Sequence, residues 1–261
     1  MYTDLFKGAA PFYAAYRLRY PSEVIRLVVD RFHLSSQDRV LDVGCGPGQL
    51  AIRLADWSKH IVGVDVDKGM LQEASKMANL LKISNIEWKL ADVEKFINLQ
   101  HHESFKLVTI GKSFHWLNRS HFLEKLYPTI QKAGGIAVID DYQPDNVLED
   151  WQIAFSKVAK KWYGEERRAG SGTYSHPTLS HEEVIEKSPF SIEKVECEPY
   201  EHYWTIETLL GHHYSTSYGL KSYLGSNVDD FEAEVKRELL SIHSEGKFKE
   251  EIRVKVLLGY K

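Results

Sequence analysis

The chain has 261 residues, of which 43% are hydrophobic and 27% are charged, which is sufficient for one large core and excludes wholesale disorder. The formal net charge of −4 gives no general attraction to phosphate backbones or anionic membranes, so we predict neither nucleic acid nor a membrane as a partner. There are only two cysteines, the N-terminus lacks a signal-peptide pattern, and no apolar run reaches the roughly 20 residues of a membrane span. These features predict a cytoplasmic protein.

The first half of the chain alternates between helical and strand patterns. Apolar residues at helical spacing, the first set after a proline–serine start signal, predict helices over residues 23–32, 50–57, 70–81 and 122–132. Short β-rich or alternating runs predict strands over residues 40–43, 61–65, 86–90, 106–110 and 136–139. This alternation is typical of a doubly wound α/β fold with a mostly parallel sheet, in which ligands bind at the carboxyl ends of the strands.

After Tyr142 the alternation stops. The pattern predicts a helix over 151–162, a loop over 164–181, strands over 192–195 and 252–258, and a helix over 231–242. The two late strands bring the predicted sheet to seven. We therefore predict a single domain over 1–261, acting as a monomer or homodimer. Its predicted parts are a cofactor-binding core at 33–142, a helical substrate cap inserted after the fifth strand at 143–190, and a segment at 191–261 that completes the sheet.

A glycine-rich loop follows the first predicted strand, with the sequence Gly44-Cys45-Gly46-Pro47-Gly48. A dinucleotide-binding loop has its third glycine one position later. Asp42, two residues before the loop, would repel a pyrophosphate but would suit the ammonium of a methionyl group or a nearby sulfonium. The loop therefore favours S-adenosylmethionine, with an NAD-linked oxidoreductase as the alternative.

Acidic residues end the next two predicted strands. Asp65 follows the glycines at the distance where an acid accepts hydrogen bonds from ribose hydroxyls, in NAD and S-adenosylmethionine sites alike. Asp92 ends the third strand, where a carboxylate can accept from the adenine amine or cap the following helix; we weigh these two readings equally. Acids at successive strand ends, together with the loop, predict a nucleoside site.

Four segments resemble class I S-adenosylmethionine-dependent methyltransferases: residues 40–48, 62–65, 91–93 and 113–117. They are similar in particular to the type 11 small-molecule branch, which includes trans-aconitate methyltransferase-like proteins. Residues 13–21 resemble the opening segment of that branch, although Leu18-Arg19 stands where the branch more often has a proline after the first arginine. The resemblance covers residues 11–142, and it implies a Rossmann-like methyltransferase fold that binds S-adenosyl-L-methionine.

The resemblance also implies roles for individual residues. Backbone near Gly44 and Gly46 would approach the methionyl group, and Asp65 would hold the ribose. Arg17 would face the methionyl carboxylate, unless it is an ordinary surface arginine. The complete set of predicted cofactor-binding residues is Arg17, Asp42, Gly44, Cys45, Gly46, Asp65, Val66, Met70, Asp92, Val93, Gly111 and Ser113. Cys45 is most simply a small buried residue of the loop, and we predict no catalytic thiol.

Methyl transfer from a sulfonium depends mainly on alignment and desolvation, and a general base is needed only where the acceptor carries a proton. His115, directly after the fourth strand, is the predicted catalytic, substrate-facing residue, with a helix cap or packing residue as the alternative. His176 and the pair His212-His213 are second choices. Segment 101–103 (His-His-Glu) reads as an exposed loop whose adjacent residues rarely converge on one ion, so we predict no metal site.

The acceptor is predicted to be a small organic molecule methylated at oxygen or carbon. The end of the fourth strand lacks the Asn/Asp-Pro-Pro-Tyr motif of enzymes that methylate planar amino groups. Aromatic residues gather after Tyr142, and Arg167-Arg168 would suit an acidic substrate. The competing interpretation is that these rings are core and that 165–168 is a solvated face. A non-catalytic S-adenosylmethionine-binding protein also stays open as an alternative.

Overall fold

The computed structural model describes residues 5–143, 145–169, 172–173 and 177–261. The chain forms two compact units, each described by itself. The sheet unit comprises Arg19–Asp141, His176–Glu198 and Arg253–Lys261, and the helical unit comprises Met1–Leu18, Tyr142–Ser175 and Pro199–Ile252. Within the described residues, no helix is both long and apolar enough to cross a membrane.

The sheet unit contains seven strands in the order β3-β2-β1-β4-β5-β11-β8. Strands β1 to β5 run parallel, and β11 is antiparallel to both of its neighbours. The strands are β1 (Arg39–Val43), β2 (His60–Asp65), β3 (Ile86–Leu90), β4 (Phe105–Gly111), β5 (Ile130–Asp140), β8 (Ser191–Glu196) and β11 (Lys255–Tyr260). The predicted seven-stranded, mostly parallel, doubly wound sheet is confirmed. The strand order reverses between β1 and β4, and ligands of such sheets bind at this point, beside the carboxyl ends.

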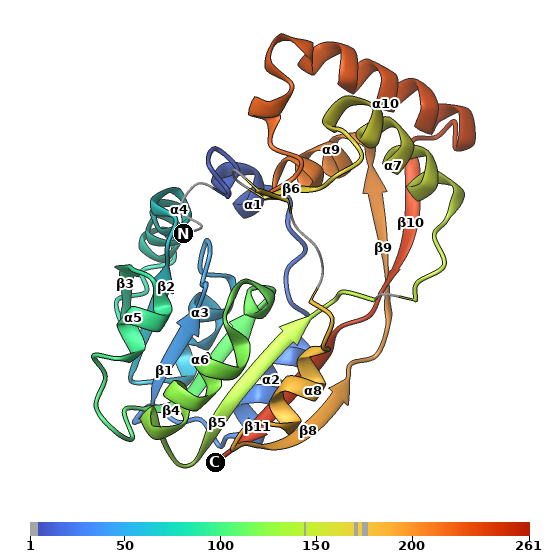
Figure 1. Cartoon of the computed structure of the whole chain (residues 1–261). Coiled ribbons are helices and arrows are strands. Elements are labelled where there is room, and N and C mark those ends of the chain that lie inside the picture. Colours follow the sequence, from blue (N-terminus) through green and yellow to red (C-terminus); the bar gives the residue numbers. More distant parts are fainter. Residues whose placement is uncertain (1–4, 144, 170–171, 174–176) are drawn as a thin grey trace. The chain divides into compact units, whose positions relative to one another are not determined.

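Helices cover both faces of this sheet (Figure 1). The sheet-unit helices are α2 (Ser22–Arg31), α3 (Gln49–Leu54), α4 (Lys68–Leu80), α5 (Val93–Ile97), α6 (Arg119–Leu126) and α8 (His181–Glu186). Apolar residues of α5, α6 and α8, such as Ile97, Phe122 and Ile185, pack with strand residues in one fully buried cluster. α2 begins directly after Pro21, as predicted, and buries Val24 and Val28.

The predicted helix over 122–132 is wrong in its second half. α6 ends at Leu126, a single 3-10 turn (Tyr127–Thr129) follows, and β5 already begins at Ile130. Pro128 lies in that turn, where its ring and its missing N–H prevent the α-helix from continuing. The predicted last strand over 252–258 is observed as β11, which begins three residues later, whereas Ile252 ends a separate strand of another sheet, β10 (Lys247–Ile252).

Within its described residues, the helical unit is built from four α-helices and two antiparallel ribbons of two strands each. Its elements are α1 (Ala10–Tyr16), α7 (Asp150–Tyr163), β6 (Arg168–Ala169), β7 (Gly172–Thr173), β9 (Tyr200–Thr205), α9 (Ile206–Tyr214), α10 (Val228–Ile242) and β10, which pairs with β9. Large rings dominate its core, including Trp151, Trp204, Tyr214, Phe231 and Phe248. Most of the aromatic residues predicted after Tyr142 are therefore core residues of this unit.

These units differ from the predicted domain boundaries. We predicted a cap at 143–190 and a sheet-completing segment at 191–261. In the structure, β8 and β11 do belong to the sheet, but Pro199–Ile252 belongs to the helical unit together with Tyr142–Ser175 and the N-terminal segment. The difference arises because β9 and β10 pair with each other and because α1 packs on α9, both through contacts that are distant in sequence.

Candidate functional site

The glycine loop lies at the carboxyl end of β1 and uses three left-handed backbone conformations. Gly44, Gly46 and Gly48 have φ values of +60°, +52° and +81°, which residues with a side chain rarely adopt. A Cβ atom on Gly44 would lie 2.6 Å from the Cβ atom of Ser113, at the end of β4. The loop therefore brings bare backbone close to the neighbouring strand end.

Ser113 joins the ends of β1 and β4. Its hydroxyl donates a hydrogen bond to the carbonyl oxygen of Val43, at 2.8 Å. Lys112, the residue before it, has a positive φ of 55° and forms an ion pair with Asp141 beyond the end of β5. The segment after β4 is thus fixed to the strands on both of its sides.

Asp65, at the end of β2, is hydrogen bonded to the glycine loop. The Gly46 amide donates to its Oδ2 atom at 2.8 Å, and the Asp67 amide donates to Oδ1 at 2.8 Å. Burial raises the pKa of Asp65, while these two amides oppose the rise because they stabilise the charged form. The structure therefore joins the predicted methionyl-binding loop and the predicted ribose-binding acid in one half-buried cluster.

Asp42 lies beneath this cluster and not at its surface. Its side chain is buried, and both carboxylate oxygens accept hydrogen bonds from the protein: Oδ1 from the Thr109 hydroxyl at 2.7 Å and Oδ2 from the Ala51 amide at 3.2 Å. Desolvation raises the pKa of Asp42 to about 7. From its charge we predicted that this carboxylate faces the cofactor. In the structure it instead accepts hydrogen bonds from β4 and α3 and so holds them to β1.

The remaining cofactor candidates occupy the ends of β2, β3 and β4. Asp92 caps α5 by accepting a hydrogen bond from the Lys95 amide at 3.1 Å, and it stays exposed, so the capping interpretation is observed directly. Met70, in the first turn of α4, and Val93 are buried, whereas Val66 is exposed. The predicted adenine contacts of this group stay predictions.

Gly111 and Cys45 are closely packed. A Cβ atom on Gly111 would lie 2.3 Å from the hydroxyl oxygen of Tyr20, an aromatic neighbour that the sequence pattern did not indicate. Burial raises the pKa of the Cys45 thiol well above its ordinary value, which keeps it protonated and unreactive. Its position agrees with the interpretation as a small buried loop residue.

Arg17 belongs to the helical unit. It contacts the Nε2 atom of His212 at 3.3 Å and lies over the ring of Tyr13, while its own buried Nε atom has no hydrogen-bond partner among the described residues. Its predicted contact with a methionyl carboxylate stays a prediction. Of the second-choice histidines, His176 lies outside the described residues, and His213 is enclosed by aromatic rings that lower its pKa to about 3 through desolvation.

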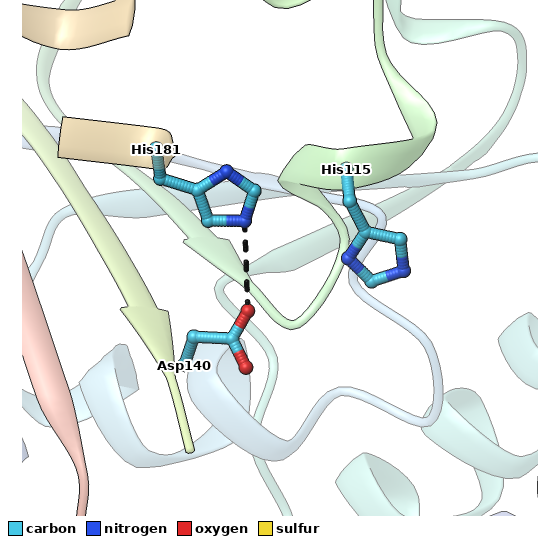
Figure 2. Close-up of side chains that lie close together, drawn as sticks. All are labelled: His115, Asp140 and His181. Atoms are coloured by element: carbon cyan, nitrogen blue, oxygen red, sulfur yellow. Dashed lines mark ion pairs between the residues drawn. The ribbon is translucent and has the colours of Figure 1, made fainter. Parts of the chain in front are cut away.

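His115 lies in a short 3-10 helix (Phe114–Trp116) directly after β4, and two further side chains of the sheet unit turn toward it (Figure 2). These are Asp140, the last residue of β5, and His181, the first residue of α8. The ring of His115 is parallel to that of His181, with centroids 6.4 Å apart, and His181 Nε2 lies 3.6 Å from Asp140 Oδ2.

Sequence reasoning did not select Asp140 or His181. A signal was present for each: Asp140 ends a predicted strand, as the other candidate acids do, and Ser180 with Glu183 forms the start pattern of a helix. In the structure this pattern is a capping box, in which the Ser180 hydroxyl accepts from the Glu183 amide and the Glu183 carboxylate accepts from the Ser180 amide. The box fixes His181 at the first helical position.

Sequence comparison places this architecture among known proteins. Residues 34–194 match a family described as a methyltransferase domain. A Dictyostelium discoideum protein named as a methyltransferase is 24% identical over 93% of this chain and 87% of its own length. The malonyl-[acyl-carrier protein] O-methyltransferase of a Paenibacillus species is 26% identical over 70% of this chain and 67% of its own length.

Structure comparison agrees on the fold. The solved structure of a Haemonchus contortus ethanolamine-phosphate N-methyltransferase, in complex with its phosphomonomethylethanolamine ligand and S-adenosylhomocysteine, matches with a TM-score of 0.57. The sequence identity is 14%, and the match covers 99% of this chain and 60% of that one. At this identity the likeness concerns the fold of the chain.

Proposed function

This chain belongs to the methyltransferase-domain family and is an S-adenosylmethionine-dependent enzyme, and on that premise we propose that it methylates an oxygen or carbon atom of a small organic acceptor. The NAD-linked alternative is thereby set aside. The observation that carries the proposal is the position of His115, two residues after Ser113. The Ser113 hydroxyl donates a hydrogen bond to the carbonyl oxygen of Val43, the residue directly before the glycine loop. His115, a side chain that could face the acceptor, therefore comes shortly after residues that we expect to surround the methyl donor.

The residues of the loop suit the cofactor. Backbone without side chains at Gly44 and Gly46 allows close approach of a ligand, and the adjoining carboxylate of Asp65 has the chemistry to accept ribose hydroxyls. Asp92 is exposed at the next strand end, where its second oxygen can accept a further hydrogen bond. S-adenosylmethionine supplies an activated methyl group, so the chain itself needs no covalent catalysis.

The work left to the chain is to orient the acceptor and exclude water. We assign the first task to His115, which lies beside the Trp116 ring with centroids 4.8 Å apart. If the acceptor is a carboxylate, no proton has to be removed, and His115 then orients it by hydrogen bonding. If the acceptor is an enol or a phenol, the same side chain is positioned to take its proton.

Three observations support a small acceptor at oxygen or carbon. The segment after β4 is Lys112-Ser113-Phe114-His115, which lacks the motif used for planar amino groups. One relative is named as a malonyl-[acyl-carrier protein] O-methyltransferase, which agrees with methylation of an oxygen atom such as that of a carboxylate. The resemblance to trans-aconitate methyltransferase-like proteins points in the same direction.

The proposal is tested by incubating the full chain with S-adenosylmethionine labelled in its methyl group. Three panels are offered in parallel: small mono-, di- and tricarboxylic acids; phenols and enolisable ketoacids; and total RNA. We expect label in at least one small molecule. His115→Ala should lower kcat/KM for it, by about 100-fold or more where a proton is removed.

The matched control is His121→Ala, an exposed histidine in α6 of the same unit, which should leave the rate unchanged. Label in RNA alone would contradict the proposal. So would cofactor binding without turnover on any panel, which is the result expected of a non-catalytic binding protein.

A further inference from the structure

Three side chains with metal-binding chemistry converge at the carboxyl edge of β4 and β5 (Figure 2). Each of His115, Asp140 and His181 offers one ligand atom, and these atoms all lie within 4.8 Å of one another. The three residues come from three separate elements, each fixed independently: the 3-10 turn after β4, the end of β5, and the capping box of α8. Folding therefore brings two imidazoles and a carboxylate together from distant parts of the sequence.

The spacing of His181 and Asp140 is close to that of two ligands around one ion, and the ligand atom of His115 lies within 4.8 Å of both. His181 Nε2 and Asp140 Oδ2 are 3.6 Å apart, which is too long for a hydrogen bond. Two ligands of a tetrahedral zinc site, with bonds of about 2.1 Å, lie about 3.4 Å apart. The side chains of His181 and Asp140 are only 19% and 23% exposed, so a shared ion would be partly shielded from water.

The carboxylate of Asp140 and the ring of His181 are both held in place. The Asp141 amide donates to Asp140 Oδ1 at 2.8 Å, which leaves Oδ2 as the oxygen turned toward His181. Phe114 packs edge-on against the His181 ring, with centroids 5.0 Å apart. Outer contacts of this kind orient metal ligands and hold them ready for the ion.

We propose that His115, Asp140 and His181 form a binding site for a divalent first-row transition-metal ion such as Zn²⁺ or Co²⁺. Two imidazoles and one carboxylate suit these borderline ions better than Mg²⁺ or Ca²⁺, which prefer oxygen ligands alone. Three protein ligands leave at least one coordination position open. An ordinary ion pair between His181 and Asp140 would not involve His115, so the contribution of His115 distinguishes the two accounts.

The contact between Arg119 and His181 has to change when the site binds an ion. Its Nη1 atom lies 3.0 Å from His181 Nδ1, 3.0 Å from the Leu179 carbonyl oxygen and 3.2 Å from that of Ser180. A neutral imidazole that binds an ion through Nε2 keeps its proton on Nδ1. The two Nη1 hydrogens of Arg119 then go to the two carbonyl oxygens, and we expect the guanidinium to move away from the ring.

The open coordination position of the ion could bind the methyl acceptor, an inference that rests on the proposed function. Asp140 and His115 lie at the strand ends where the sheet is expected to hold its ligands. With an ion bound, His115 is a ligand and does not take the acceptor's proton itself. Instead, the ion would bind the acceptor through oxygen atoms and would lower the pKa of a hydroxyl or enol, so that it reacts as the anion. The predicted absence of metal rested on residues 101–103 alone, and nothing in sequence groups the three residues of this site.

The binding experiment uses the full chain without an affinity tag, stripped of metal with a chelator, in the absence of S-adenosylmethionine and acceptor. Co²⁺ is titrated while its visible absorption is recorded, and Zn²⁺ binding is measured by calorimetry. We expect one equivalent to bind, with the absorption of a low-coordinate cobalt site. His115→Ala, Asp140→Asn and His181→Ala should each weaken binding by more than about 100-fold, since even removal of outer-shell partners costs about 10 to 100-fold.

His121→Ala is the matched control and should bind as the wild type does, which would show that removing a surface histidine does not by itself weaken metal binding. Thermal unfolding of each metal-free variant shows whether the variant is folded. If an alanine variant does not fold, Asp140→Asn tests the site in its place, because asparagine has nearly the same shape as aspartate. No stoichiometric binding, or binding that His115→Ala leaves unchanged, would overturn the site. Because neither methyl donor nor acceptor is present, this result is independent of whether the proposed methylation is correct.

Discussion

Replacing Asp42 by asparagine should remove a pH-dependent part of the free energy of unfolding. The buried carboxyl group has its pKa raised to about 7 in the folded chain, from an ordinary value of 3.8. Between these two values the folded chain holds a proton that the unfolded chain has released. The folded state therefore binds more protons, and its stability falls as the pH rises through this window.

The size of the effect follows from the gap between the two pKa values, which corresponds to about 4 kcal/mol when the pH is raised from below 4 to above 7. Asparagine can keep both native contacts: its carbonyl oxygen accepts from the Ala51 amide, and its amide donates to the Thr109 hydroxyl, which also lies 3.5 Å from the Leu41 carbonyl oxygen. The substitution should therefore remove the titration without leaving a buried polar atom unsatisfied.

The assay is urea denaturation of the wild type and Asp42→Asn at intervals from pH 4.5 to pH 8. Groups common to both proteins cancel in the difference, which should shift in favour of Asp42→Asn by roughly 2 to 4 kcal/mol across this range. Asp56→Asn, at an exposed position in the same unit, is the control and should give a constant difference. A constant difference for Asp42→Asn as well would contradict this prediction, because the carboxyl group would then titrate alike in the folded and unfolded states.

Three further predictions concern the same unit. Gly44→Ala should cost about 2 to 4 kcal/mol in urea denaturation, because it strains a left-handed residue and forces a Cβ atom against Ser113; an unchanged midpoint would show that the loop can rearrange. Asp65→Ala should weaken S-adenosylmethionine binding by about 1.5 to 3 kcal/mol in calorimetry, and equal affinity would remove Asp65 from the site. Ser180→Ala should lose about 1 kcal/mol of stability through the lost cap on the Glu183 amide, whereas Ser180→Thr should retain it.

Local patterns in the sequence are enough to predict the elements to which we assign the cofactor. The run of buried residues in β1, the positive-φ glycines after it and the acid at the end of β2 each depend on a few neighbouring residues. The same is true of α2, which begins after Pro21. Such features can be read from sequence because periodicity and turn chemistry act within a few residues. The end of α6 at Leu126, just before the turn that contains Pro128, could be predicted for the same reason, although the helical spacing around it masked the signal.

The tertiary structure decides what each of these residues can touch. Asp42 has the right charge for the cofactor, but pairing of β1 with β4 buries it against Thr109. His115 stands alone in sequence, yet the order of the strands and the packing of α8 bring Asp140 and His181 beside it. The split of residues 199–252 from the sheet likewise depends on the pairing of β9 with β10. Local sequence patterns were therefore enough to predict the glycine loop and the α/β class, whereas long-range packing sets the partners of each side chain, because contacts between distant residues leave no local pattern.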